Sequence, residues 1–294
     1  MEIKNMGRLK KILMNLIPDY WYVKLQYKQI MGKSLNLSSP KTLSEKLNWL
    51  KVYYHNPLLH KLVDKAEVKE YVSNKIGADY TIPTIGLWNK VEDINISTLP
   101  DKFVLKCTHD SGSIEVCRNK ETFDLKAVKE RLGKGAMINY YEGKREWAYK
   151  GVPPRIIAEP FIPNLGDKDS IEYKLTVYNG KVRFISVCTG IAHIGYNERK
   201  NDHYTPEWQR LPFWVYYKPS GNDYEKPSFM DEMIRLTEKL AEGLPQVRID
   251  WYVNEGKMLF GEMTFYTWAG YLKFNPVEWD EILGNWFELP KKWR

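Results

Sequence analysis

The sequence has few cysteines, and none of them stands where a disulfide framework or a zinc site would need it. The three cysteines are odd in number and form no CxxC pair. This argues against disulfides and favours a reducing, cytoplasmic location. The five histidines show no metal-ligand spacing. The composition therefore disfavours disulfide-stapled secreted domains and zinc proteins of the common kinds.

Long apolar runs and nucleic-acid-binding motifs are also missing. No apolar stretch reaches the roughly 18 residues of a membrane-spanning helix. The basic N-terminal segment has no small-residue cleavage site, so we expect no signal peptide. The basic residues are spread along the chain, and we expect no nucleic-acid partner. A formal charge of +7 nevertheless points to anionic partners such as nucleotides, acidic glycans or phospholipids.

What is present is the composition of a folded protein. The 294 residues are 43% hydrophobic and 28% charged, which is typical of globular proteins and not of disordered ones. Helical and strand patterns alternate, the strands form hairpins, and no linker clearly divides the chain. We therefore expect an α+β fold with antiparallel sheets.

The first 17 residues predict a basic amphipathic helix that ends at Pro18. Apolar residues recur at steps of three and four, with lysines and an arginine between them. Two interpretations stay open for residues 1–17. The helix packs on its own protein, which is the commoner case, or it contacts an anionic membrane surface, which would place the protein at the inner face of the membrane.

Two further helices are indicated before residue 80. Thr42 and Glu45 have the spacing of a capping box and predict a helix over 42–54. Pro57 at a first helical position predicts another helix that continues to Gly77.

Strand signals follow in the second half of the chain. Asn179-Gly180 predicts a tight turn between two strands within residues 171–188. Residues 189–227 are polar, aromatic and irregular, and we expect a long loop there. Ser228 and Asp231 then predict the cap of a helix.

The segment 247–270 is the most informative part of the chain. Apolar and charged residues alternate before a turn at 254–256, which predicts two strands with one apolar and one charged face. If the turn has three residues, Arg248 lies opposite Glu262 and Asp250 shares their face. Carboxylates suit Mg²⁺, which is usually held by one or two of them plus substrate phosphates. An arginine suits a charged transition state, so the pattern outlines a nucleotide and metal site.

An ordinary surface hairpin explains the same pattern. Arg248 and Glu262 would then form a cross-strand salt bridge, and charged faces on half-buried strands are common. A register slip of one residue would turn Glu262 to the other face. Both interpretations stay open on the hairpin alone.

Two phosphate-binding candidates precede the hairpin. Lys106 ends a strand and is followed by a Ser111-Gly112-Ser113 turn, where a lysine and backbone N–H groups can meet phosphate oxygens. Lys65, after Asp64, is a second candidate lysine. The plain alternatives are solvated lysines and a simple turn.

A hinge and a charged strand complete the set. The apolar segment 156–162 breaks at Glu159, and its exposed backbone at Phe161 and Ile162 is suited to bind an adenine edge. Lys174 shares a strand face with Glu172. Each of these could equally be a strand end or a surface pair.

In this order the motifs resemble the ATP-grasp superfamily. Within that superfamily, the sequence more closely resembles the teichuronopeptide-biosynthesis-type (TupA-like) family of surface-polysaccharide gene clusters, over about residues 40 to 290. The segments that carry the resemblance are KLNWLKVYYHNPL, DKAEVKEYVSNKIG, FVLKCTHDSGS, IIAEPFI, EYKLTVYNGKVRFI, VRIDWYV and FGEMTF.

The resemblance implies two α+β lobes that hold ATP between them. The implied division is an N-terminal helical segment over 1–80, a small lobe over 81–158 and a large lobe over 159–294. The implied binding roles are phosphate contacts for Lys65 and Lys106, a covering loop for Ser111, Gly112 and Ser113, adenine contacts for Glu159, Phe161 and Ile162, and Mg²⁺ ligation for Asp250 and Glu262. The implied catalytic residues are Arg248, which would stabilise the transition state, and Lys174, which would lie near the phosphates.

Thr264 departs from the superfamily pattern. The last metal ligand of these proteins is usually Asn, and a hydroxyl is a weaker ligand than an amide carbonyl. Thr264 is the third candidate ligand, and metal binding would depend more on Asp250 and Glu262.

The implied activity is ATP-dependent ligation of a carboxylate to an amine through an acylphosphate. The expected substrates are an amino acid or amine and a uronic acid of a bacterial surface polysaccharide, such as a capsule, or its precursor. Two alternatives stay open. One is a glycosyltransferase, although no Asp-x-Asp metal motif is found; the other is a glycan- or membrane-binding module without turnover.

Overall fold

The computed structural model describes residues 16–163, 170–190 and 198–293. Its helices are α2 (Asp19–Met31), α3 (Leu43–Tyr53), α4 (Leu58–Val63), α5 (Val68–Ile76), α6 (Leu125–Ala136), α7 (Tyr140–Lys144), α8 (Met230–Leu240) and α9 (Trp279–Asn285). Its strands are β1 (Gly86–Trp88), β2 (Phe103–Cys107), β3 (Ile114–Cys117), β4 (Ile156–Pro160), β5 (Glu172–Tyr178), β6 (Lys181–Thr189), β7 (Lys200–Tyr204), β8 (Arg210–Leu211), β9 (Trp214–Val215), β10 (Gln246–Asn254), β11 (Lys257–Thr264) and β12 (Phe274–Asn275). The predicted helix over 1–17 lies almost wholly outside the described residues.

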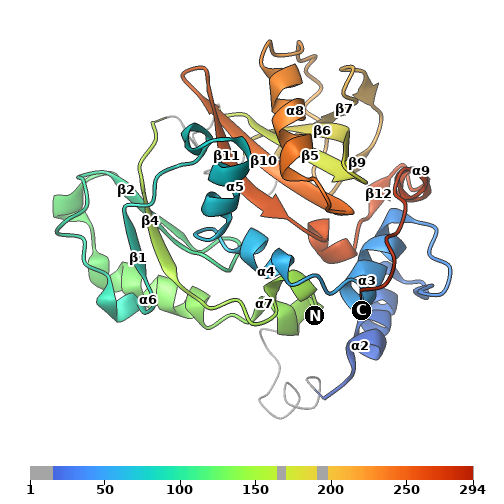
Figure 1. The fold of residues 1–294 in the computed structure, drawn as a ribbon, viewed down its shortest axis with the longest axis horizontal. Coiled ribbons are helices and arrows are strands. Elements are labelled where there is room, and N and C mark those ends of the chain that lie inside the picture. The colour runs from blue at the N-terminus through green and yellow to red at the C-terminus, as the bar shows by residue number, and fades with distance from the viewer. Residues whose placement is uncertain (1–15, 164–169, 191–197, 294) are drawn as a thin grey trace.

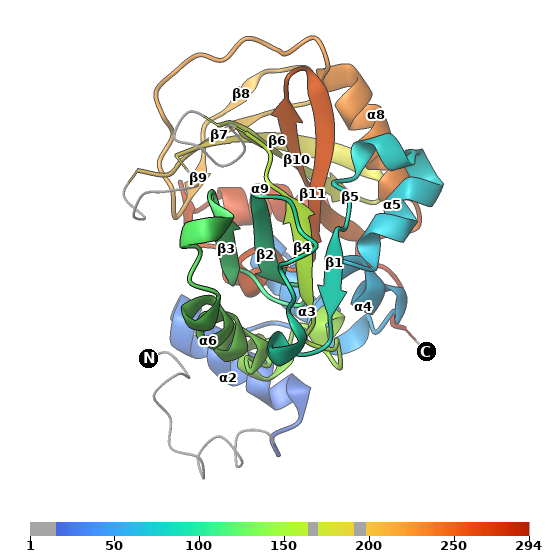
Figure 2. The same ribbon diagram turned by 90° about the vertical axis from the view of Figure 1, so that its left-hand side faces the viewer.

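Two antiparallel sheets organise the described chain. The smaller has the strand order β1-β4-β2-β3, and the larger has the order β11-β10-β5-β6-β7-β8. Helix α6 packs against β2 and β3, whereas α8 packs against β5 and β6. In Figure 1, α4 and α5 lie between the two sheets, and Figure 2 shows both helices along one side of the molecule; both contact β11.

Buried apolar side chains form two clusters within the described residues. The larger surrounds the six-stranded sheet and includes Leu175, Ile249 and Trp251. The smaller lies between the four-stranded sheet and α6, and includes Phe103 and Leu132. Each sheet thus has its own core, as an α+β protein with two packed sheets requires.

Local sequence signals account for several of these elements. The predicted capping box is confirmed: Thr42 Oγ1 accepts from the Glu45 N–H at 3.3 Å, and a Glu45 carboxylate oxygen accepts from the Thr42 N–H at 3.2 Å. The Asn179-Gly180 turn is also confirmed, with φ of 52° and 77° at its two residues. Positive φ at both positions is what a two-residue hairpin turn requires.

The single helix predicted from Pro57 to Gly77 is wrong. It is broken into α4 and α5, and Asp64 lies at the break. The Asp64 carboxylate accepts from the backbone N–H groups of Ala66 and Glu67 at 2.8 and 3.1 Å. An Asp side chain that satisfies these donors favours a new helix start over a continued helix.

Two other local predictions need correction. The expected loop over 189–227 contains three short strands, β7, β8 and β9. Helix α8 begins after Phe229, and no side-chain hydrogen bond caps it, so Ser228 and Asp231 do not form the predicted cap.

The chain buries its cysteines as free thiols. Cys107, Cys117 and Cys188 are all described and unpaired, as predicted. Burial raises the pKa of Cys107 to about 11 and of Cys188 to about 12, which keeps both protonated and disfavours a nucleophilic role. In the described part of the chain, no helix has the length and apolar character that a membrane crossing needs.

Candidate functional site

The hairpin of β10 and β11 has a different turn from the one predicted. Asn254 lies opposite Lys257, so the loop has two residues, Glu255 and Gly256. Their φ angles of 50° and 77° fit such a turn. The three-residue turn, and with it the pairing of Arg248 with Glu262, is wrong.

A β-bulge restores the charged face. Trp251 pairs with Phe260, but the next pair is Asp250 with Glu262, so Gly261 is the extra residue. Without the bulge, Glu262 would lie opposite Ile249 and turn to the apolar face. The bulge therefore brings Glu262 to the face that carries Asp250.

Glycine is needed at the bulge for lack of space. A Cβ at Gly261 would lie 2.8 Å from a ring carbon of Tyr252 and 3.0 Å from the carbonyl oxygen of Asp250.

We expect Gly261→Ala to lower the unfolding free energy by about 1–3 kcal/mol. Gly143→Ala is the control, because nothing lies within 4 Å of a Cβ there. Urea titration of both variants measures the difference, and equal stability would show that the bulge tolerates a side chain.

Arg248 and Asp250 form the centre of the site. The Arg248 Nε lies 2.6 Å from Asp250 Oδ1, and its terminal nitrogen lies 2.7 Å from Oδ2. The same nitrogen is 3.4 Å from Glu262 Oε1 and 3.0 Å from Thr264 Oγ1. Thr264 donates to Glu262 at 3.2 Å. A forked contact of this kind fixes the plane of the guanidinium.

Lys174 joins this centre from the neighbouring strand. It is the register partner of Asp250 on β5, and its Nζ lies 2.5 Å from Asp250 Oδ2 and 2.7 Å from Glu172 Oε2. Burial alone would raise the pKa of Asp250, but the charges of Arg248 and Lys174 hold it below its ordinary value. Burial would lower the pKa of Lys174, yet Asp250 and Glu172 hold it well above its ordinary value. Arg248, Asp250 and Lys174 are therefore ionised at neutral pH.

The four-stranded sheet supplies a second charged group. The Glu159 carboxylate is held between Lys106 and Lys69, each at 2.6 Å. Lys69 also donates to the Ile82 carbonyl at 2.6 Å. Burial raises the pKa of Glu159, but the two lysines outweigh it and lower the pKa. The sequence analysis found Lys106 and Glu159 but not their pairing, and it missed Lys69.

Lys65 interacts electrostatically with both groups. Its backbone N–H donates to the Thr108 carbonyl at 3.0 Å, and its Nζ donates to the Asp110 carbonyl. Burial lowers the pKa of Lys65, the Glu262 charge opposes this shift, and the Lys106 charge adds to it. Glu262 of the larger sheet and Lys106 of the smaller are thus both in electrostatic range of Lys65.

The loop 111–113 is anchored by an aromatic side chain that the sequence analysis missed. The Tyr140 hydroxyl accepts from the Ser111 N–H at 3.1 Å and donates to the Ser111 carbonyl at 2.9 Å. Its ring lies 5.5 Å from that of Tyr149. Burial, followed by the charges of Glu146 and Glu262, raises the pKa of Tyr149 well above its ordinary value. Tyr149 is therefore a neutral phenol in electrostatic range of Glu262.

Gly112 and Ser113 complete this loop in a compact arrangement. Gly112 has a φ of 111°, which favours glycine. Ser113 lies against α6, since a Cβ on Gly135 would come within 2.1 Å of its hydroxyl oxygen.

The hinge after Glu159 uses part of its backbone in the sheet. The Phe161 N–H donates to the Lys102 carbonyl at 3.3 Å, and the Arg118 guanidinium lies 4.9 Å from the Phe161 ring centre. Ile162 is half-buried. These residues lie beside Glu159, where the sequence analysis expected an adenine contact.

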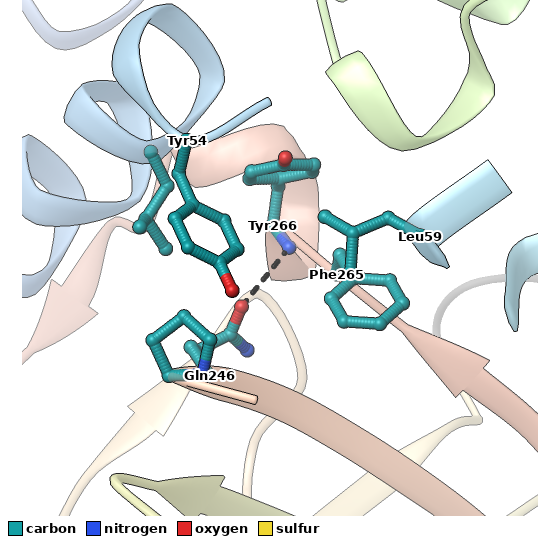
Figure 3. A pocket seen from close by; sticks show the side chains of 7 residues that line it. Tyr54, Leu59, Gln246, Phe265 and Tyr266 are labelled. Carbon is teal, nitrogen blue, oxygen red and sulfur yellow. Dashed lines mark hydrogen bonds between the residues drawn. The ribbon is translucent and has the colours of Figure 1, made fainter. Parts of the chain in front are cut away.

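The segment after Thr264 has an unusual backbone. Tyr266, Trp268 and Ala269 all have positive φ, between 52° and 55°, and such strain persists only where neighbours hold it. Lys51 of α3 is buried and donates to the Ala269 carbonyl at 2.5 Å. Figure 3 shows the small cavity beside this segment, with the Tyr54 hydroxyl turned toward Gln246. Its volume of about 10 Å³ is far below that of a nucleotide.

The site supplies two candidate side-chain ligands for Mg²⁺. No group of three or more His, Cys, Asp or Glu side chains that could hold a metal occurs among the described residues. Asp250 and Glu262 are nevertheless register partners, and Asp250 Oδ1 accepts only from Arg248 in the described chain. Two carboxylates fit a Mg²⁺ ion whose other ligands are phosphates and water.

Several solved structures resemble this chain at low sequence identity. The D-alanine–D-alanine ligase from Bacillus anthracis complexed with ATP is 14% identical, with 75% of this chain and 57% of that chain covered and a TM-score of 0.43. The D-cycloserine synthetase DcsG is 13% identical, with 93% and 96% covered and a TM-score of 0.46. The ATP-grasp ligase PsnB, complexed with a phosphomimetic variant of its minimal precursor, Mg and ADP, is 11% identical, with 83% and 64% covered and a TM-score of 0.42.

These likenesses are too distant to assign a substrate. The chain spans 57–59% of the length of the D-alanine–D-alanine ligases that it matches. No curated protein matches the chain.

The family assignment rests on the sequence. The family described as TupA-like ATPgrasp matches residues 45–288, which is most of the chain. This confirms the resemblance drawn from the motifs, and the α+β architecture is that of the ATP-grasp fold. The chain belongs to the TupA-like ATP-grasp family.

Proposed function

We propose that the protein is an ATP-dependent, ADP-forming carboxylate–amine ligase. The observation that carries the proposal is the gathering of Arg248, Asp250 and Glu262 on one face of the β10–β11 hairpin, with Glu262 in electrostatic range of Lys65. Lys65 in turn interacts with Lys106. Cations facing carboxylates across a small site suit a nucleotide whose phosphates lie between them.

The proposed reaction has two steps. An oxygen of the substrate carboxylate attacks the γ-phosphorus of ATP, the bond to the β-phosphate oxygen breaks, and an acylphosphate and ADP result. An amine then attacks the acyl carbon, loses a proton and expels phosphate, which leaves an amide. Both steps develop negative charge on oxygen, so fixed cations accelerate them.

The side chains would divide this work by position. Lys65, Lys106 and Lys174 would bind the phosphates, and the N–H groups of the 111–113 loop would cover them. Arg248, whose plane Asp250 fixes, would stabilise the oxyanion formed at the acyl carbon. Asp250 and Glu262, with Thr264 beside them, would hold Mg²⁺, which when bound neutralises phosphate charge and orients the γ-phosphate.

The adenine would lie near Glu159. Lys69 and Lys106 hold this carboxylate in place, so the pair of lysines would preset the hinge before nucleotide binds. The lobe boundaries at 81–158 and 159–294 are part of the same proposal, with ATP between the two sheets.

We further propose an acidic sugar as the carboxylate. The family is associated with surface polysaccharides, and the chain has a net charge of +7, which suits a uronic acid of a polysaccharide or its precursor. An amino acid would supply the amine. The proposed location is cytoplasmic, where ATP is available and free thiols are stable.

ADP release across a panel of uronic acids, each paired with single amino acids, tests the proposal. We expect repeated turnover to ADP only when a carboxylate and an amine are both present, because a carboxylate alone can form the acylphosphate and at most one ADP per enzyme. Hydrolysis of a UDP-sugar without ADP formation would favour the glycosyltransferase alternative. ATP binding without turnover on any pair would favour the binding module.

Lys106→Met is expected to weaken ATP binding about 10- to 100-fold, because one charge-assisted contact contributes about 1.5–3 kcal/mol. The fold should survive, since Glu159 keeps Lys69 as a partner at 2.6 Å. Lys126→Met, on the exposed side of α6, is the matched control. Calorimetric titration with ATP measures the effect, and an unchanged affinity in folded Lys106→Met would remove this lysine from the nucleotide site.

A further inference from the structure

Helix α2 presents an outward face with side chains that stay exposed among the described residues. Its inner stripe of Tyr22, Val23, Gln26 and Tyr27 is buried. The opposite stripe, which we call the α2 surface, consists of Trp21, Lys24, Leu25 and Lys28. Their spacing of three, four and seven residues places them on one side of the helix. Figure 1 shows α2 at the lower edge of the molecule, outside both sheets.

The α2 surface combines exposed apolar and basic side chains. Trp21 and Leu25 are each 57% exposed, and Leu16 just before the helix is 74% exposed. Lys24 Nζ lies 5.2 and 5.7 Å from the ring centres of Tyr20 and Trp21, so a cation lies beside the aromatic rings. Single exposed apolar residues are ordinary, but a Trp and a Leu four residues apart with flanking lysines form a face suited to an interface.

The α2 surface is also firmly attached to the rest of the protein. Gln26 accepts from the Tyr271 hydroxyl at 2.8 Å, and its amide donates to the Gly143 carbonyl at 3.0 Å. Tyr271 follows the strained segment that begins after Thr264. Whatever binds the outer face of α2 would therefore be held at a fixed orientation to the candidate site.

We propose that the α2 surface docks on a membrane that contains anionic phospholipids. A Trp ring is amphipathic and favours the headgroup level, Leu25 enters the acyl boundary, and the lysines pair with anionic headgroups. The charge of the preceding sequence fits the same partner, because residues 4–11 include Lys4, Arg8, Lys10 and Lys11. The inference is independent of the ligase proposal.

Vesicle co-sedimentation of the full chain tests this assignment. We expect binding to phosphatidylcholine vesicles that contain about a third phosphatidylglycerol, and at least tenfold weaker binding to phosphatidylcholine alone, with the difference shrinking as salt is raised. Trp21→Ala/Leu25→Ala should bind at least tenfold more weakly than the unmodified protein, and so should Lys24→Glu/Lys28→Glu. Leu87→Ala/Trp293→Ala is the matched control, since each of its side chains is 45% exposed elsewhere on the surface.

The outcomes separate the membrane from other occupants. Thermal unfolding of all variants should lie close to that of the unmodified protein, because none of the changed side chains belongs to the buried core. Failure of the unmodified protein to bind the anionic vesicles overturns the proposal. Unchanged binding of both α2 variants also overturns it and assigns the binding to another surface. A dimer that Trp21→Ala/Leu25→Ala converts to monomer, without vesicle binding, would identify a second copy as the occupant.

Discussion

Replacing Asp250 with asparagine is expected to abolish ADP formation and to lower the unfolding free energy by about 3 kcal/mol. Asp250 is 1% exposed, and its two oxygens hold Arg248 and Lys174 at 2.5–2.7 Å. The asparagine keeps the shape of the side chain but leaves two cations in a site with less negative charge. The sequence alone gives no reason to expect Asp250→Asn and Glu262→Gln to differ in stability. The structure gives one, because Asp250 is buried whereas the Glu262 side chain is 36% exposed.

The stability effect has a pH dependence of known sign. The pKa of Asp250 is lowered in the folded state, so its contribution is present above the unfolded value, about 3.9, and is lost as the pH falls through the folded value. The melting temperatures of the unmodified protein and Asp250→Asn should therefore converge below about pH 4. Differential scanning calorimetry between pH 3 and pH 8 measures this convergence.

Asp231→Asn provides the control for Asp250→Asn. Asp231 is paired with Lys226 at 2.6 Å, but its side chain is 82% exposed, so its loss should change stability by no more than about 1 kcal/mol. If Asp250→Asn melts like the control at pH 7, the Arg248–Asp250–Lys174 network does not stabilise the fold.

The charged face of β10 was predictable because strand alternation is local. Arg248 and Asp250 stand two residues apart, and any extended strand places them on one side. The position of Glu262 was not predictable in the same way, because it depends on the turn length and on a bulge that each shift the register. The predicted turn was too long by one residue, and the bulge at Gly261 was not predicted. Each of these errors shifts the pairing of β11 with β10 by one residue. The two shifts add up to two residues, so Glu262 still lies on the charged face, as predicted.

The ion pairs of Glu159 in the smaller sheet could not be predicted from the sequence, for a different reason. Lys106 and Glu159 lie on neighbouring strands, β2 and β4, whose pairing requires a connection of some 50 residues to fold back. No local pattern gives that pairing. Lys69 is one of 44 lysines and arginines, and nothing in its neighbours marks it as the second partner of Glu159. The motif order found by resemblance identified the individual residues, whereas only the folded chain shows which of them touch.

Glu262→Gln is expected to reduce ADP formation at least about 100-fold with almost no loss of stability. Glu262 is 36% exposed, and its contact with Arg248 is a long one at 3.4 Å, so the neutral amide should cost no more than about 1 kcal/mol. The charge matters for the reaction, because Glu262 faces Asp250 across the hairpin and acts on Lys65. An uncharged side chain there would lose affinity for a cation shared with the phosphates. Glu255→Gln in the exposed turn is the matched control.

Thr264→Asn is expected to keep or improve activity, in contrast to Glu262→Gln. The first change replaces one uncharged oxygen ligand with another, whereas the second removes a charge. Thr264 accepts from Arg248 at 3.0 Å, and an asparagine carbonyl can accept the same bond while adding a stronger oxygen ligand. We expect near-normal or improved ADP release in a Mg²⁺ titration, with a midpoint at equal or lower Mg²⁺ concentration. Substrate-dependent ADP release of Glu262→Gln is measured in the same titration. Near-normal turnover in Glu262→Gln would contradict the ligase assignment of this face, and the binding module would then be the better explanation of a charged but inactive site.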